Sequence, residues 1–181
     1  IQDLKDLRRI RNRRHQFIDE YNKIAFGGKG SIQSFLDNIS KIQSDEEDML
    51  DDIIHEISHA VEQNNYDLIY EDEQVLLEFL GKRKKLYNLL KSQGFNVNIK
   101  EFMQVKYSED FDMLLFQEIG YPFLNNLVIG LFPGAYSVTS INEYFASGFQ
   151  KYYMNELNYI AKICPNLTRK LNYLDELANE Y

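Results

Sequence analysis

Apolar residues recur every three or four positions along much of the chain, which is the spacing of amphipathic helices. Five stretches show this spacing, namely 3–25, 44–63, 72–93, 140–154 and the segment after Pro165. Ser44 and Glu47 form a capping box at the start of the second stretch, and Gly94 can end the third. Thr139 or Ser140 can cap the fourth. The pattern predicts a mostly helical protein.

Two shorter segments favour β-strands. Residues 99–107 show a partial alternation of apolar and polar positions, and 127–132 form an apolar run that Pro133 and Gly134 close. Together with the helical stretches, these segments predict an α+β fold that is mostly helical, with a small or incomplete β-sheet.

The spacing also predicts which side of two helices is buried. In 44–63, the residues expected to face the core are Met49, Ile53, Ile57 and Ala60. In 72–93, the consecutive basic residues Lys82, Arg83, Lys84 and Lys85 are expected to be exposed.

Composition narrows the functional classes. With 181 residues, 44% of them hydrophobic, the chain is expected to form one globular domain. A net charge of -8 argues against general nucleic-acid binding, although five arginines between 8 and 14 form a solvated helix face or contact an acidic partner. No apolar run reaches the roughly 18 residues that span a membrane. Because the sequence does not begin with Met, we expect it to be a processed chain or a fragment of a longer protein. Its expected partners then include other domains of that protein.

The strongest chemical signal is His55-Glu-Ile-Ser-His59, inside the predicted helix 44–63. Histidines four residues apart lie on one face of a helix, where both can bind one zinc ion. Zinc lowers the pKa of a bound water towards about 7, and Glu56 can accept the proton from that water. The alternative is a chance match between two ordinary surface histidines.

A catalytic zinc site needs a third protein ligand and one open position. No third histidine follows His59 closely, so the candidates are acidic. Glu62 reaches back poorly from the same helix, and an orienting role or simple exposure suits it better. Glu143 opens a separate helix, where it is either a ligand or a solvated carboxylate of the first turn.

Several motifs together resemble the anthrax lethal factor-like metallopeptidases, a gluzincin family that includes the clostridial Pro-Pro endopeptidases. The resemblance is carried by His55-Glu-Ile-Ser-His-Ala-Val-Glu62, by Tyr136 seven residues before Glu143, by Asn142-Glu-Tyr-Phe-Ala146 and by Phe149. It implies that His55, His59 and Glu143 bind zinc and that Glu56 is the catalytic base. It also implies that Tyr136 donates a hydrogen bond to the oxyanion of the tetrahedral intermediate.

The resemblance further implies a single zincin-like metallopeptidase domain over 1–181. Its parts would be an N-terminal helical lead-in (1–43), the active-site helix (44–64), an insertion (95–133) and C-terminal helices (140–181). The chain departs from the family at Ser147, where an acid is common, and in the weak strand signals of 1–43.

The function expected from these residues is a zinc-dependent endopeptidase acting on a peptide or protein. The alternative is a non-catalytic, structural domain of a larger toxin or phage particle protein. The chain keeps both histidines, both glutamates and the tyrosine, which favours the enzyme. The family implies a toxin-like role in virulence and a chain that is secreted or delivered within a larger bacterial or phage protein, with a cytoplasmic location as the alternative.

Overall fold

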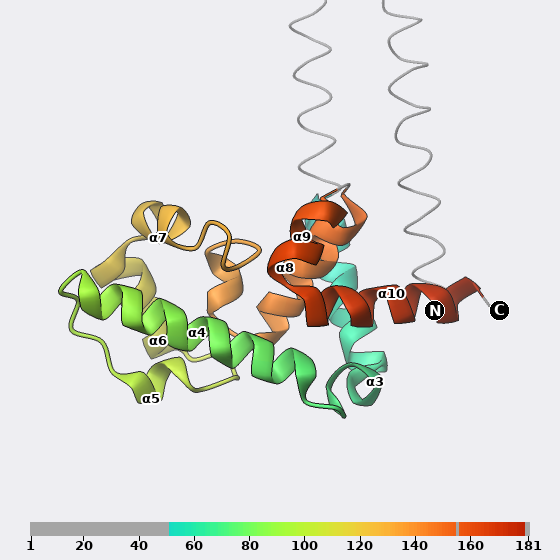
Figure 1. Cartoon of the computed structure of the whole chain (residues 1–181), viewed down its shortest axis with the longest axis horizontal. Coiled ribbons are helices and arrows are strands. Elements are labelled where there is room, and N and C mark those ends of the chain that lie inside the picture. The colour runs from blue at the N-terminus through green and yellow to red at the C-terminus, as the bar shows by residue number, and fades with distance from the viewer. Residues whose placement is uncertain (1–50, 155, 180–181) are drawn as a thin grey trace, which may run out of the picture.

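The computed structural model describes residues 51–154 and 156–179, and the regular structure in these ranges is helical (Figure 1). Residues 51–64 form a helix that carries both motif histidines, called here the HExxH helix. The elements that follow are α3 (Tyr66–Tyr70), α4 (Gln74–Ser92), α5 (Ile99–Phe102), α6 (Glu109–Met113), the π-helix η1 (Leu114–Ile119), α7 (Tyr121–Leu127), the 3₁₀ turn η2 (Tyr136–Val138), α8 (Ile141–Tyr153), α9 (Leu157–Ile163) and α10 (Pro165–Asn179).

The helices expected over 72–93, over 140–154 and after Pro165 are confirmed as α4, α8 and α10. Gly94 follows α4 with a φ of 89°, as a glycine that ends a helix can. The helix expected over 3–25, the arginine cluster and the capping box at Ser44 lie outside the described residues. Among the described residues, no helix is both long and apolar enough to cross a membrane.

The expected α+β fold with a small sheet is wrong for the described residues, because both strand candidates belong to helices and turns. The Asn98 side chain accepts a hydrogen bond from the Lys100 amide and so caps α5 in place of a strand. In the second segment, the Phe132 amide donates a 3.0 Å hydrogen bond to the carbonyl of Val128, four residues back, as in a helical turn. Val128 and Phe132 are buried while Ile129 is 72% exposed, so the apolar run faces the core on one side only.

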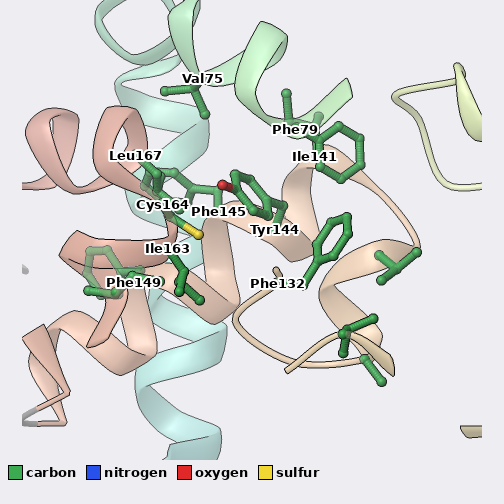
Figure 2. Packing of buried hydrophobic residues seen from close by; sticks show 14 of the residues in the cluster. Val75, Phe79, Phe132, Ile141, Tyr144, Phe145, Phe149, Ile163, Cys164 and Leu167 are labelled. Atoms are coloured by element: carbon green, nitrogen blue, oxygen red, sulfur yellow. The ribbon is translucent and has the colours of Figure 1, made fainter. Parts of the chain in front are cut away.

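The core lies where α4, α8 and α10 meet (Figure 2). The ring of Tyr144 in α8 packs 5.3 Å from that of Phe79 in α4. Its hydroxyl donates a 2.7 Å hydrogen bond to Glu78, which also accepts one from the Asn166 amide at the start of α10. Leu167 joins the same cluster from α10. These contacts fix α8, the helix that carries Glu143.

The expectation that α4 exposes four basic residues is wrong for two of them. Lys84 and Lys85 are exposed, but Lys82 is 9% exposed and Arg83 is fully buried. Arg83 can be buried because its guanidinium finds backbone carbonyls to bind, including those of Val138 and Thr139 at 2.8 Å. The run of basic residues therefore contains a structural cation.

The buried face expected for the HExxH helix is also wrong, by one position. Ile54, Ser58 and Val61 are buried, whereas Ile53 is 40% exposed and Ala60 is exposed. Ile57 is only partly buried, and Met49 lies outside the described residues. The observed register turns the two motif histidines towards α8, which runs beside this helix (cyan in Figure 1).

Candidate metal and catalytic site

Glu143 owes its position to the start of α8. The Ser140 side chain caps this helix by accepting a 3.2 Å hydrogen bond from the Glu143 amide, which confirms one of the two expected caps. Ile141, Tyr144 and Phe145 are buried, so their neighbour Glu143 is left on the side of α8 that meets the HExxH helix. Its carboxylate is 17% exposed.

The structure brings His55, His59 and Glu143 together, although 88 positions separate the first from the last. Nε2 of His55 lies 3.1 Å from Oε2 of Glu143, and Nε2 of His59 lies 3.6 Å from Oε1. The donor atoms of all three lie within 4.8 Å of one another. The two imidazole rings stand nearly perpendicular, with centroids 5.1 Å apart.

These separations suit a tetrahedral metal ion. Two ligands about 2.0 to 2.1 Å from zinc, at the tetrahedral angle, stand roughly 3.3 to 3.4 Å apart. The distances from the two nitrogens to Glu143, 3.1 Å to Oε2 and 3.6 Å to Oε1, lie near that value. Two imidazoles and one carboxylate are also a common zinc donor set. The side chains of His55 and His59 are 23% and 33% exposed, so solvent can reach a fourth position. The residues present therefore fit a zinc ion.

Glu62 lies close to His59. It is 2% exposed, so the second of the two alternatives expected for it, simple exposure, is wrong. Its carboxylate lies 4.0 Å from Nδ1 of His59, on the side of the ring away from Glu143. Tyr70 and Asn142 donate hydrogen bonds to it, the latter at 3.0 Å. Burial raises the pKa of Glu62, and these two hydrogen bonds oppose the rise.

Gln150 is a second residue of α8 that interacts with His55. It lies seven residues after Glu143 on α8 and forms a side-chain hydrogen bond with His55. The hydrogen bond with Glu143 raises the pKa of His55, and the Gln150 hydrogen bond adds to this rise.

Tyr136 lies in η2, on the segment that leads into α8, and is 45% exposed. Burial of its inner part raises the pKa of Tyr136, and the charge of Glu143 adds to the rise, so the two side chains are close enough to interact. Arg83 stabilises this segment, because its guanidinium donates hydrogen bonds to the backbone carbonyls of Val138 and Thr139. Tyr136 therefore lies on a supported turn that leads into α8, seven residues before Glu143.

Two other acidic residues differ in their relation to the triad. Glu56 is exposed, and its charge contributes to the raised pKa of its neighbour His55. Glu118, another acidic residue of the chain, is exposed on η1 and does not belong to the cluster.

Two cavities involve residues near the triad. One, of about 450 Å³, is lined by residues that include Gln150 of α8 and Asp51, but by no member of the triad. Another, of about 300 Å³, is lined by His59, Glu62, Tyr66 and Asn142.

Sequence reasoning missed the supporting residues Tyr70, Arg83, Asn142 and Gln150. For two of them the sequence held a clue, because they lie on the same predicted helix as Glu143. Asn142 directly precedes Glu143, and Gln150 follows Glu143 by two helical turns. Tyr70 and Arg83 act across the fold, and nothing local in the sequence marks them.

Comparisons with protein-family models, with curated proteins and with solved structures found no match for this chain.

Proposed function

We propose that this chain is a zinc-dependent endopeptidase, in which His55, His59 and Glu143 hold the metal. The observation that carries the proposal is the convergence of these three side chains from two different helices, with their possible ligand atoms within 4.8 Å of one another. The resemblance of the surrounding motifs to lethal factor-like metallopeptidases supports the same reading. The hypothesis of an ion pair without metal is weaker, because it gives no role to the buried Glu62 behind His59.

In this proposal, zinc supplies a Lewis acid for the scissile carbonyl and lowers the pKa of a water molecule towards about 7. The residues of the chain do the rest. Glu56, exposed beside His55, accepts the proton of the attacking water and delivers it to the leaving amine. The Tyr136 hydroxyl donates a hydrogen bond to the oxyanion of the tetrahedral intermediate. Glu62 and Gln150 keep the imidazole rings oriented.

The alternative is a domain that binds metal without catalysis, within a larger toxin or phage particle protein. Substitution of Glu56 distinguishes the peptidase from the non-catalytic domain, because in the proposal Glu56 takes part in catalysis but does not bind zinc. Zinc-loaded protein should cleave fluorogenic peptides from a random-sequence library, and a chelator should abolish the cleavage. Glu56→Gln should keep zinc and the thermal unfolding temperature but lose nearly all turnover.

Glu118→Gln is the matched control. Glu118 is exposed and lies outside the cluster, so its substitution should leave zinc content and peptide cleavage unchanged. Cleavage that survives in Glu56→Gln would contradict the mechanism. Zinc binding without cleavage of any library peptide by the unmodified chain would favour the non-catalytic domain.

A further inference from the structure

A second polar cluster lies in the segment between α5 and α8. Asp112, in α6, accepts two hydrogen bonds of 2.8 Å from phenols, one from Tyr107 at Oδ2 and one from Tyr121 at Oδ1. Both tyrosines are thereby held in one orientation by a single carboxylate. The Asp112 hydrogen bond contributes to raising the pKa of both phenols, so at neutral pH they stay protonated and keep donating.

This cluster is continuous with the candidate metal site through Tyr136. The Tyr121 ring lies 6.4 Å from the Tyr136 ring and is tilted by 35°, and the Phe116 ring lies 6.2 Å from Tyr121 on another side. The carboxylates of Glu143 and Asp112 both contribute to the raised pKa of Tyr136. Tyr136 therefore contacts this cluster through Tyr121 and lies on the segment that leads into α8, the helix of Glu143.

Most of this surface faces solvent. Tyr107 is 52% exposed, Phe116 62% and Tyr136 45%, while Tyr121 is partly buried. Single exposed aromatics are ordinary, but a run of them that ends at a candidate catalytic site marks a binding surface. The four rings (Tyr107, Phe116, Tyr121 and Tyr136) are called here the aromatic patch.

We propose that the aromatic patch is the docking surface for the polypeptide substrate, and that it binds a bulky apolar or aromatic side chain on the Tyr136 side of the scissile bond. This inference rests on the proposed peptidase function.

Three features of the patch favour this occupant. Tyrosine rings bind apolar groups with large contact area, and hydrogen bonds that already fix them reduce the entropy lost on binding. Asp112 has accepting capacity left after its two phenols, so it can also bind a backbone N–H of the substrate. Finally, the described residues contain no strand that could pair with an extended substrate. Side-chain contacts must then supply affinity in this part of the chain.

The test is a binding experiment that needs no turnover. Zinc-loaded Glu56→Gln protein is applied to an array of immobilised random-sequence dodecapeptides, and dissociation constants for the bound peptides are measured by fluorescence anisotropy. Bound peptides should be enriched in aliphatic and aromatic residues at one position. Adding Tyr107→Ala or Tyr121→Ala should weaken binding by about 5- to 30-fold, the usual effect of removing an aromatic anchor from an interface.

Two variants serve as controls. Tyr107→Phe keeps the ring and should stay within about threefold of the parent, because the ring supplies most of the contact. Tyr173→Ala removes a tyrosine of similar exposure, 44%, from α10 and should have no effect. Because Tyr107 is half exposed, its removal should leave the thermal unfolding temperature unchanged.

The outcomes separate this inference from the peptidase proposal. Loss of binding in the patch variants, with peptides that the unmodified chain also cleaves, supports both. The same loss with no cleavage by the unmodified chain supports the docking surface and rejects the peptidase. Unchanged affinity in Tyr107→Ala and Tyr121→Ala, or no enrichment of apolar residues among bound peptides, overturns the docking surface even if cleavage is observed.

Discussion

Replacing Arg83 by Met should remove a central support of the candidate site. The guanidinium is fully buried and donates hydrogen bonds to the carbonyls of Val138 and Thr139, both at 2.8 Å, and of Glu101 at 3.2 Å. It also lies 4.2 Å from the centroid of the Phe111 ring. Burial lowers the pKa of Arg83 to about 9, which still leaves it a cation at neutral pH.

The expected cost follows from these contacts. Methionine fills a similar volume but leaves the Val138 and Thr139 carbonyls, both buried, without a donor, at about 1 to 3 kcal/mol each. The lost cation–π contact adds about 1 to 2 kcal/mol in a desolvated site. Relief from burying a charge offsets part of this. We therefore expect the free energy of unfolding of Arg83→Met to fall by about 3 to 5 kcal/mol.

Urea unfolding followed by circular dichroism measures this loss. Arg169→Met is the matched control, because Arg169 is an exposed arginine on α10 and should cost little. Arg83→Lys should fall between the two, since a single ammonium cannot reach all the carbonyls. A loss below about 1 kcal/mol in Arg83→Met would refute the role assigned to these hydrogen bonds.

Three further predictions concern the site itself. Glu62→Gln should keep the fold but weaken zinc binding by about 10- to 100-fold in competition with a chromophoric chelator, and an unchanged affinity would reject its orienting role. Tyr136→Phe should retain zinc while kcat falls by roughly 10- to 1,000-fold, so full activity would exclude an oxyanion contact. Zinc affinity should also weaken as the pH falls through the raised pKa of His55, by about tenfold per pH unit for each proton displaced, because the metal needs the neutral ring. Titrations that give one affinity from pH 8 to pH 5 would contradict this.

The parts of the site that sequence could predict are those with local signals. His55 and His59 are four residues apart, and a helix of any origin places them on one face. Ser140 caps α8 through a hydrogen bond three residues along the chain, which again is local. Helix existence and these side-chain spacings therefore follow from neighbours in the sequence.

The parts that sequence could not predict depend on distant contacts. Arginine is usually a surface residue, and Arg83 is buried because carbonyls of distant segments accept its hydrogen bonds, including those of Val138 and Thr139 more than 50 positions away. Ile53 and Ile54 are both apolar, so periodicity alone could not decide which of them faces the core. In the structure Ile54 is buried, and the resulting rotation of the helix about its axis places the two histidines on the side that faces Glu143.

The strand predictions failed for a related reason. In 127–132, a short apolar run has no period that separates a strand from a helix end, and Gly130 with a φ of 73° turns the chain there. In 99–107, the short-range hydrogen bond of Asn98 with the Lys100 amide starts a helical turn. Neither segment has a partner strand among the described residues.

The central claim, that two helices join to hold one zinc ion, is tested most directly by metal content. Inductively coupled plasma mass spectrometry of the purified, zinc-equilibrated chain should give about one zinc per molecule, as a single site of three ligands requires. Glu143→Ala should keep its helical circular dichroism spectrum and lose nearly all of this zinc at the same free concentration. Zinc content and affinity in Glu143→Ala that equal those of the unmodified chain would contradict the claim.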